Sequence, residues 1–453
     1  MKVAVSDKPK LISGQYTEVI DNYKLYYNPL GYGGVTMIDT QSQTLLNLCD
    51  GKKTINHIAK VDGRDINTIL DEINSLVNSE VIFLSDEFTS ELHKKNNSKK
   101  NISCWLHLTN SCNLTCSYCY VHKTPGSMSL KTGKLAIDKM LQTCRNNNIE
   151  NMNIKFAGGE PLLRFDLIKK LVNYSQIMRN DIKVTYTLLT NGILITKEIA
   201  EYIKHNNIGV GVSLDGIGEV NDFCRFDKNK NGSFERVIKG LEVLKIVNVK
   251  PSIMTTVSSS NYRDLMDLTK FILDEEYFFR FSLEKDCDTG FTKLSNQNED
   301  LIDKLHGYYD YIESRLPNDD FTKIHKFGDA SFKKPAKKSC GAASNLVSIG
   351  HDGKIGVCGL GLSNPFSTLD ESNDLLLQTS KYNHQLTNNI ASDYDSCHTC
   401  VWRKSCAGGC PLQTKAAFGR YDKQSPYCEV YKAILPRVLR TKGLQMIRDS
   451  KID

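Results

Sequence analysis

Between residues 102 and 285, short apolar segments alternate with longer amphipathic ones. The short segments are rich in β-branched and aromatic residues, which is typical of strands; they are 104–108, 153–157, 184–189, 210–214, 252–257 and 278–283. The segments between them, such as 131–146 and 234–247, have the apolar spacing of helices. Strands that alternate with helices predict an α/β fold with a parallel sheet.

The first 90 residues have a different pattern and predict a small separate domain, 1–90. Strands are expected at 23–27, 34–39 and 81–84, and helices at 44–50, 54–59 and 65–78. Thr54 and Asp65 are suited to cap the second and third helices. A polar stretch follows, and we interpret 91–101 as a linker.

The remaining chain divides into four further regions. We expect a central domain at 102–289 and a polar, helical bridging region at 290–339. Residues 340–430 contain seven cysteines and few long periodic segments, and 431–453 have the pattern of a terminal helix.

Composition and charge exclude several classes of protein. The chain has 453 residues, of which 40% are hydrophobic and 24% charged, an ordinary globular balance. No apolar run is long enough to span a bilayer, and the N-terminus lacks the apolar segment of a signal peptide, so we expect no membrane contact and a cytoplasmic location. The net charge of +6 is spread along the chain, which argues against nucleic-acid binding.

The chain contains 15 cysteines, an odd number and a high one. Disulfides are not expected in a reducing compartment, so metal binding accounts better for the count. Three cysteines lie at 112–119 and seven between 340 and 428, whereas five are scattered: Cys49, Cys104, Cys144, Cys224 and Cys287. We interpret most of these five as ordinary buried thiols.

The closest cysteine group is Cys112, Cys116 and Cys119, separated by three and then two residues. Thiolates are the usual ligands of iron–sulfur clusters, and three of them leave one iron of a four-iron cluster open. A zinc site is the alternative, but structural zinc usually takes four protein ligands and no fourth ligand lies at zinc spacing.

Polar or glycine-rich residues follow three of the other predicted strands. They are Gly158, Gly159 and Glu160 after 153–157, Thr190 and Asn191 after 184–189, and Ser213 and Asp215 at the end of 210–214. Ligands of parallel sheets bind beyond the carboxyl ends of the strands, so these residues and the cysteines are expected at one rim. For the glycines, a plain strand–helix turn is the alternative.

Together these motifs resemble the radical SAM superfamily over about residues 102–285. The resemblance implies a partial (β/α)6 barrel in which Cys112, Cys116 and Cys119 hold a [4Fe–4S] cluster that binds S-adenosylmethionine (SAM). It implies that Gly158, Gly159 and Glu160 meet the methionine end, Ser213 and Asp215 the ribose, and Tyr118 the adenine, with Thr190 and Asn191 on the same rim. Three further residues are expected to face the barrel, each with a structural ion pair as the alternative: Arg225, Arg280 and Glu284.

The C-terminal cysteines resemble the SPASM extension of radical SAM enzymes, with structural zinc as the alternative. The resemblance implies two auxiliary [4Fe–4S] clusters, and therefore three clusters in all. The outer auxiliary cluster would be held by Cys397, Cys400, Cys406 and Cys428, and the inner one by Cys340, Cys358 and Cys410. The inner set is one cysteine short, so either one iron is open or a distant residue such as Cys287 completes it.

The N-terminal domain resembles the PqqD-like peptide-recognition domain, which is winged-helix-like. The resemblance rests on Asn28-Pro29, on 49–54 and on the helix–strand finish at 65–84. A nucleic-acid-binding winged helix is the alternative, but segment 65–78 has three acidic residues and no basic one, the wrong sign for phosphate contact. Domains of this kind bind a leader peptide as an added strand.

The combination predicts an enzyme that modifies a ribosomally made precursor peptide, with SAM and an external electron donor such as flavodoxin or ferredoxin. The expected product is an intramolecular thioether from Cys; a carbon–carbon or carbon–oxygen cross-link is an alternative, and a non-catalytic iron–sulfur or zinc peptide-binding protein is an alternative of another class. Sulfatase-maturing enzymes carry an Asp base directly after the cysteine equivalent to Cys358. Here that position is Gly359, which argues against formylglycine formation.

Overall fold

A computed structural model of the chain describes residues 3–84, 101–316, 339–342, 344–371, 373–383, 386 and 396–452. Most of the expected linker and residues 317–338 of the bridging region lie outside these ranges. No helix among the described residues combines the length and the apolarity that crossing a bilayer requires.

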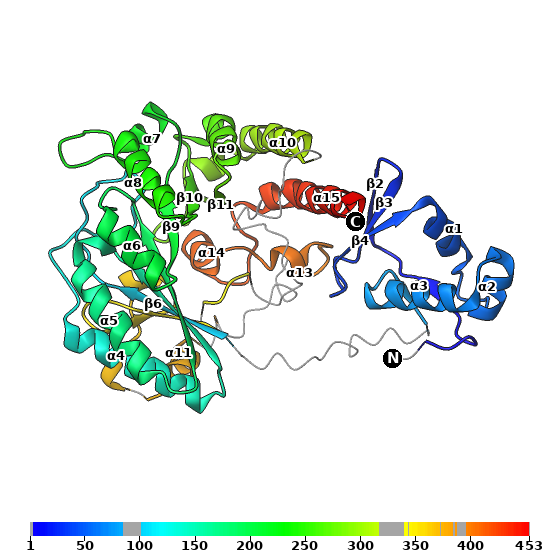
Figure 1. The fold of residues 1–453 in the computed structure, drawn as a ribbon, viewed down its shortest axis with the longest axis horizontal. Coiled ribbons are helices and arrows are strands. Elements are labelled where there is room, and N and C mark those ends of the chain that lie inside the picture. Colours follow the sequence, from blue (N-terminus) through cyan, green and yellow to red (C-terminus); the bar gives the residue numbers. More distant parts are fainter. Residues whose placement is uncertain are drawn as a thin grey trace.

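Six parallel strands in sequence order form the centre of the molecule, and all six expected strands are confirmed (Figure 1). They are β6 (Asn101–His107), β7 (Asn151–Ala157), β8 (Lys183–Thr190), β9 (Gly209–Ser213), β10 (Ser252–Val257) and β11 (Phe278–Leu283). The helices that join them are α4 (Leu130–Asn146), α5 (Phe165–Met178), α6 (Lys197–His205), α7 (Glu219–Cys224), α8 (Phe234–Ile246) and α9 (Leu265–Asp274). The α/β fold with a mostly parallel sheet is therefore confirmed.

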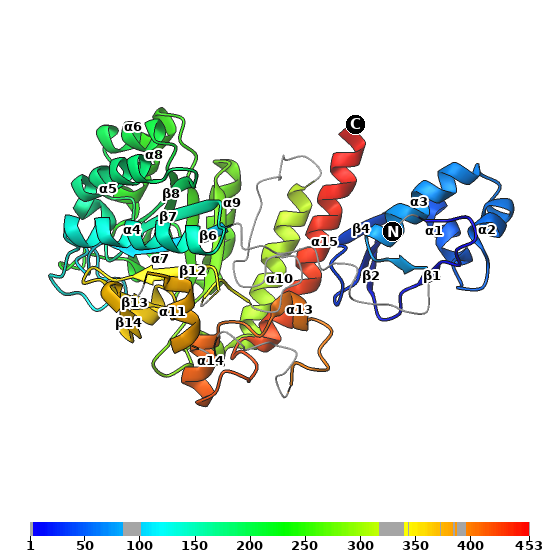
Figure 2. The same cartoon turned by 90° about the horizontal axis from the view of Figure 1, so that it is seen from below.

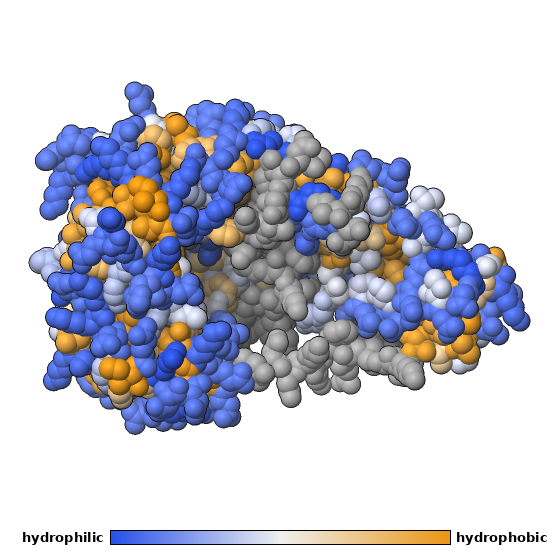
Figure 3. Space-filling view, in the orientation of Figure 1, coloured by the Kyte–Doolittle hydropathy of each residue, from blue (hydrophilic) through white to orange (hydrophobic). Residues whose placement is uncertain are grey.

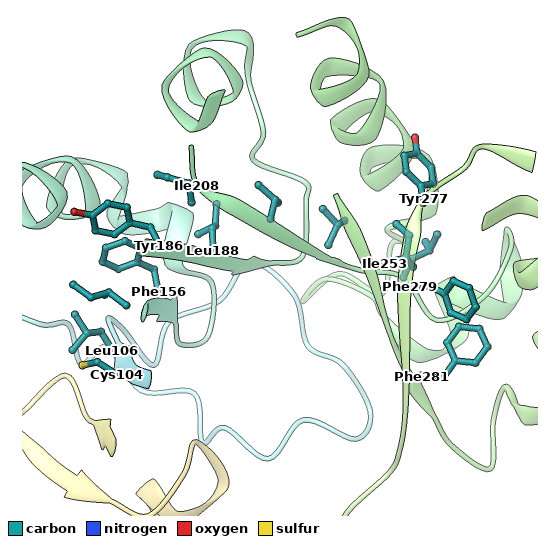
Figure 4. Close-up of a cluster of buried hydrophobic side chains, with 14 of the residues drawn as sticks. Cys104, Leu106, Phe156, Tyr186, Leu188, Ile208, Ile253, Tyr277, Phe279 and Phe281 are labelled. Atoms are coloured by element: carbon teal, nitrogen blue, oxygen red, sulfur yellow. The ribbon is translucent and has the colours of Figure 1, made fainter. Parts of the chain in front are cut away.

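The two faces of this sheet differ because side chains alternate along each strand. One face is apolar and packs under the helices, as Figure 4 shows for Phe156, Tyr186, Leu188 and Ile253. The opposite face of the same strands presents Asn153, Lys155, Thr187, Met254 and Arg280, most of them polar. We call this opposite face the polar sheet face.

The sheet continues beyond β6. Three strands from the cysteine-rich region extend it: β12 (Leu346–Ile349), β13 (Lys354–Gly356) and β14 (Ser367–Thr368). β12 pairs in parallel with β6, placing Val347 opposite Cys104, whereas β13 and β14 continue antiparallel. These strands are too short to give a periodic signal, so the sequence predicted neither them nor a nine-stranded sheet.

The N-terminal residues form their own small body, which Figure 1 shows apart from the central sheet. Its antiparallel sheet contains β2 (Tyr16–Ile20), β3 (Tyr23–Tyr27) and β4 (Val35–Asp39), and β1 (Lys10–Leu11) pairs with β5 (Ile82–Phe83). The helices are α1 (Thr40–Leu48), α2 (Ile55–Asp62) and α3 (Ile66–Asn78), and the Thr54 and Asp65 caps are confirmed. The first helix begins four residues before the expected Thr44, because the Asp39 side chain accepts a hydrogen bond from the Ser42 N–H.

Figure 3 shows that the visible surface of the whole molecule is mainly hydrophilic, with scattered hydrophobic patches.

Each face of this small sheet contributes side chains to a core. Tyr26 belongs to a separate core with the N-terminal helices, whereas Leu25 and Tyr27 point the other way, into the main core. On that side lies the terminal helix α15 (Cys428–Ile452), whose Arg440 pairs with Glu18 at 2.7 Å. The N-terminal body therefore has its own core but packs on the C-terminal region (Figure 2).

The C-terminal region also contains α10 (Asn298–Arg315), α11 (Leu375–Tyr382), α13 (Arg403–Cys406) and α14 (Pro411–Phe418). α10 lies along α15, and Glu313 of α10 forms ion pairs with Arg437 and Arg440 of α15, with N···O distances of 3.0 Å each. The terminal helix begins at Cys428 rather than near residue 431, so it has a cysteine in its first turn.

Candidate functional site

The loop after β6 carries Cys112, Cys116 and Cys119, which we call the first cysteine loop (residues 112–119). Its backbone is anchored to the end of α7 and the residues that follow: the Ser117 N–H donates to the Cys224 carbonyl at 3.1 Å, and the Thr115 N–H donates to the Phe226 carbonyl at 2.6 Å. Leu114, between Cys112 and Cys116, is fully buried. The loop is thus held by backbone contacts on one side and by a buried apolar side chain.

Gly158 and Gly159 lie directly against the chain that leads into this loop. The Gly159 N–H donates to the Thr109 carbonyl at 2.6 Å, and the Glu160 N–H donates to the Ser111 carbonyl at 2.9 Å. A Cβ on Gly158 would come within 2.5 Å of the Thr109 carbonyl oxygen, and one on Gly159 within 2.2 Å of the Ser111 oxygen. The glycines are therefore required for close packing of two backbones at the rim, a role that the sequence did not reveal.

Glu160 is fully buried and joins three of the predicted motifs. Its carboxylate accepts from the Leu162 N–H at 3.0 Å, the Thr190 hydroxyl at 2.8 Å and the Asn191 N–H at 2.8 Å. Burial raises the pKa of Glu160, and these hydrogen bonds oppose the rise. The side chain of Asn191 continues the network, donating to the Asn113 oxygen at 2.7 Å and to Cys112 Sγ at 3.9 Å.

Asp215 is the centre of a second buried network at the ends of β9 and β10. Tyr118 and Arg225 both donate to its carboxylate, Arg225 at 3.1 Å, and Arg225 also donates to the Tyr118 hydroxyl. The Thr256 N–H adds a bond at 2.9 Å. Arg225 therefore forms a structural ion pair, which was the alternative to its facing the barrel. The Nε atom of Arg225 is buried and has no hydrogen-bond partner among the described residues.

Ser213 ends β9 on the polar sheet face, beside Met254 of β10, whose other neighbour is Arg280 of β11. Lys155 lies on the same face, and its pKa is lowered first by burial and then by the positive charge of Arg280. This face therefore carries two cations that repel each other, in line with the expectation that Arg280 faces the barrel. Glu284 lies beyond the end of β11, and burial raises its pKa.

The thiols of the first cysteine loop fit a cluster. None is in a disulfide, and Cys112 and Cys116 are partly buried while Cys119 is exposed. Burial raises the pKa of Cys112 and of Cys116, and the charge of each neighbouring thiol raises it further. Within the described ranges no three His, Cys, Asp or Glu side chains converge tightly enough for a single metal ion. A four-iron cluster lies between its thiolates and separates them more widely than one ion does.

Four of the C-terminal cysteines gather around the start of α15. Cys397, Cys400, Cys406 and Cys428, which we call the outer thiol set, lie close enough for their charges to act on one another. Burial and then these neighbours raise the pKa of Cys397 to about 11 and that of Cys406 to about 12. These are the same four cysteines that the resemblance implied for the outer auxiliary cluster. That they bind a cluster stays a prediction.

The remaining cysteines form a second group. Cys358 has Cys410 and Cys340 as electrostatic neighbours, and burial with these neighbours raises its pKa to about 12. Cys287, from the loop after β11, forms a hydrogen bond with Cys410 and also lies near Cys358. We call Cys340, Cys358, Cys410 and Cys287 the inner thiol set.

Tyr120 is a residue that sequence reasoning missed. Although 42% of Tyr120 is exposed, partial removal of its hydroxyl from solvent raises its pKa, and the charges of three nearby thiols, Cys119, Cys358 and Cys287, add to the rise. A Cβ on Gly359 would lie 3.2 Å from the Tyr120 hydroxyl, so this hydroxyl occupies part of the space that a side chain at 359 would need. Its place directly after Cys119 was the available signal.

A cavity of about 200 Å³ opens beside Tyr120, between the end of β6 and the β12–β13 turn. His107, Asn110 and His351 line it, with Asn110 bonded to His107 at 2.8 Å and to His351 at 3.0 Å. Burial lowers the pKa of His107. The sequence did not suggest this cavity, because its lining depends on the unpredicted pairing of β12 with β6.

Comparison with known proteins gives this arrangement a family. The family model described as the radical SAM superfamily matches residues 106–272. An uncharacterized protein of Methanocaldococcus jannaschii is 36% identical over 241 residues, covering 49% of this chain and 82% of its own. A cysteine-type anaerobic sulfatase-maturating enzyme of Clostridium novyi is 26% identical, covering 73% of this chain and 92% of its own. The radical SAM cyclopropyl synthase TigE of Paramaledivibacter caminithermalis is 22% identical, covering 95% of this chain and 96% of its own.

Solved structures show the same fold. Native anSMEcpe with bound AdoMet and the Cp18Cys peptide has a TM-score of 0.67 at 20% identity, covering 78% of this chain and 99% of its own. SuiB of Streptococcus suis, bound to the precursor peptide SuiA, has a TM-score of 0.53 at 17% identity, covering 92% and 98%. The parallel sheet, the loop of three thiols at its rim and the relatives agree: the chain belongs to the radical SAM superfamily.

Proposed function

We propose that this protein is a radical SAM enzyme that modifies a ribosomally synthesised precursor peptide. The observation that carries the proposal is the convergence of the first cysteine loop, the Glu160 network and the Asp215 network at one rim of the sheet, next to the inner thiol set. When bound, a [4Fe–4S] cluster and SAM supply a 5′-deoxyadenosyl radical that removes hydrogen from an unactivated C–H bond.

The chain's own residues have separate tasks in this proposal. Cys112, Cys116 and Cys119 hold the cluster, and Glu160 with Asn191 orients the loop that carries them through the bonds to Asn113 and Cys112. Gly158, Gly159 and Glu160 lie toward the methionine end of SAM, Ser213 and Asp215 toward the ribose, and Tyr118 toward the adenine, with Thr190 and Asn191 completing the rim. The polar sheet face receives the substrate, and an external flavodoxin or ferredoxin supplies the electron.

Residues 340–430 are proposed to be a SPASM domain with two auxiliary clusters. The separation of the C-terminal cysteines into an outer and an inner thiol set supports this assignment. The short strands β12 to β14 join this region to the central sheet, which would fix the inner thiol set next to the rim.

Residues 1–90 are proposed to be a PqqD-like domain that binds the leader of the precursor. One relative supports a precursor-peptide substrate: SuiB, which was solved with a precursor peptide, matches 92% of this chain, whereas anSMEcpe matches 78%. β2 and β4 are the edge strands of the N-terminal sheet, and an extended leader adds to such an edge. Holding the leader there raises the effective concentration of the core peptide at the rim.

The product proposed first is a thioether cross-link from a substrate cysteine. A second candidate, a cross-link that consumes no cysteine, is favoured by the position of Cys287, which lies beside Cys410 where a substrate thiolate would otherwise find an open iron. The name of the relative TigE, a cyclopropyl synthase, points to carbon–carbon bond formation in a related protein.

The test is co-expression of the full chain with a short precursor gene from its own genomic neighbourhood, followed by mass spectrometry of the peptide. Either cross-link removes two hydrogens from the peptide, but only the thioether also removes a thiol that iodoacetamide would label. The matched control is the same precursor without its leader, with which the full chain should still cleave SAM but leave the peptide unmodified. An unmodified peptide from the full chain, with SAM cleavage intact, would contradict the proposed peptide substrate.

A further inference from the structure

The loop after β11 that carries Cys287, residues 284–292, is pressed against the segment that carries Cys410. A Cβ on Gly290, which has a φ of 81°, would lie 2.0 Å from the Ala417 nitrogen in α14. The rings of Phe291 and Phe418 meet edge to face at 5.5 Å. This loop is therefore packed directly on the helix that begins immediately after Cys410.

The same loop is also held at both of its ends. The Glu284 N–H donates to Val257 at 2.8 Å, and the Glu284 carbonyl accepts from the Tyr427 hydroxyl at 3.0 Å. Tyr427 bonds in turn with the Thr292 hydroxyl at 2.6 Å. Because Tyr427 directly precedes α15, the loop is tied to the helix start that carries Cys428.

The turn around Cys287 is closed by its neighbour Asp286. The Asp286 side chain accepts from the Asp288 N–H at 2.8 Å, the Thr289 N–H at 2.9 Å and the Thr289 hydroxyl at 2.6 Å. A side chain that bonds to backbone two and three residues ahead fixes a tight turn. The thiol of Cys287 therefore leaves the loop from a fixed backbone position.

That thiol points into the inner thiol set. It forms a hydrogen bond with Cys410 and lies near Cys358, which itself neighbours Cys340. Ser339 donates to the Gly409 carbonyl, which ties the chain before Cys340 to the residue before Cys410. Each of these four thiols, from four separate segments, thus neighbours at least one other member of the set, and four is the number that a fully protein-ligated four-iron cluster requires.

We propose that Cys287 is the fourth protein ligand of the inner auxiliary cluster, with Cys340, Cys358 and Cys410. The inference rests on the proposed function, because it needs the chain to hold that cluster. On binding, each thiol gives its proton to solvent and each sulfur forms one bond to iron, so no electron is transferred. The cluster then has no open iron, and a substrate thiolate has no vacant place on it.

The test uses the full chain with Cys112, Cys116 and Cys119 all replaced by Ala, so that no open iron of the first cluster contributes. Loaded anaerobically, this chain should hold about eight irons in two clusters. Adding cyanide or 2-mercaptoethanol should leave the EPR and Mössbauer spectra of the reduced protein unchanged. When Cys287→Ala is introduced into the same chain, cyanide or 2-mercaptoethanol should bind the inner cluster and shift the part of the EPR and Mössbauer spectra that comes from it.

A matched control replaces Cys144, a buried thiol on α4 outside both sets, with Ala, and should leave the spectra as in the parent. Iodoacetamide labelling followed by peptide mass spectrometry supplies a second readout: Cys287 should be protected in the iron-loaded chain and labelled after iron is removed. Equal responses to cyanide with and without Cys287, or labelling of Cys287 in the loaded chain, would overturn the inference. A parent chain that retains no iron would instead refute the auxiliary clusters of the proposed function.

Discussion

The first cysteine loop and the inner thiol set are built in opposite ways. The first takes three thiols from eight consecutive residues and surrounds them with buried polar networks at the ends of β7 to β10. The inner thiol set takes four thiols from four distant segments, and turns, helix starts and packed loops bring them together. One site is therefore fixed by a local spacing and the other by the tertiary fold.

The difference has a physical consequence for stability. A local loop needs little loop-closure entropy, so its geometry depends mainly on its own backbone and on the polar groups that hold it. A site assembled from distant segments forms only when the domain has packed. Substitutions should therefore act differently in the two regions: by breaking charge networks near the first cysteine loop and by disturbing packing near the inner thiol set.

The largest effect should come from replacing Cys112, Cys116 and Cys119 with Ala together. Because the first cysteine loop is separate in sequence from both C-terminal thiol sets, 5′-deoxyadenosine formation should fall to background while the auxiliary iron is retained. Chromatography of the products and iron analysis of the same sample measure both. Loss of all iron would show that the two regions are not independent, and residual SAM cleavage would contradict the assignment of the loop.

The next largest effect should follow Asp215→Asn. The change leaves the buried Arg225 without its charge partner and alters the acceptor for Tyr118 and Thr256, so we expect a loss of about 3–5 kcal/mol in the free energy of unfolding. Denaturant unfolding of the iron-free chain measures it.

The control for Asp215→Asn is Glu276→Gln, which removes an exposed pair with Lys250 at 2.8 Å. Exposed pairs contribute only about 0–1 kcal/mol, so this variant should unfold almost like the parent. Similar losses for the two variants would show that Asp215 does not anchor the rim.

These networks also show what the sequence could and could not predict. Cysteine spacing and strand-end motifs are local, and they placed Cys112, Glu160, Asn191 and Asp215 at one rim, where the structure has them. The hydrogen-bond partners of these residues could not be predicted from the sequence. Glu160 accepts from Thr190 and Asn191 of the same rim, and Arg225, directly after α7, donates to Asp215. Which of several polar groups accepts a given proton depends on packing that no spacing encodes.

The C-terminal region was harder to predict for the same reason. The two thiol sets could be separated by resemblance, but the position of Cys287 beside Cys410 depends on the packing of a loop after β11 on α14. Strands of two to four residues, such as β12 to β14, give no periodic signal, so the extension of the sheet was missed. Single cysteines in long gaps carry no spacing information at all.

Gly409→Ala tests the packed region directly. Ala407, Gly408 and Gly409 all have positive φ, and a Cβ on Gly409 would lie 2.7 Å from the Ser425 Cβ. The left-handed backbone and the overlap together should cost about 2–4 kcal/mol in unfolding free energy. The same variant should lower auxiliary iron, because the turn sets Cys410.

The matched control is Gly419→Ala, which has a similar φ of 71° but open space around the Cβ position. It should cost only about 1–2 kcal/mol and leave the iron content unchanged. Equal iron loss in both variants would show that backbone conformation, rather than packing against Ser425, governs the inner thiol set.

The smallest effect, and the one that best separates the two regions, should follow Glu160→Gln. Its carboxylate accepts three hydrogen bonds, two of them from backbone N–H groups, and a Gln amide cannot accept at both oxygen positions. We expect a loss of about 1–3 kcal/mol in unfolding free energy. Because burial raises the pKa of Glu160 above its unfolded value, the folded chain gains stability from this group at low pH and loses it as pH rises through the folded pKa. Gln does not titrate, so the cost of the substitution should be larger at acid pH than at neutral pH when unfolding is followed across that range. A cost that stays constant with pH would mean that the pKa of Glu160 is the same in the folded and the unfolded chain, and would contradict the effect of burial on this group.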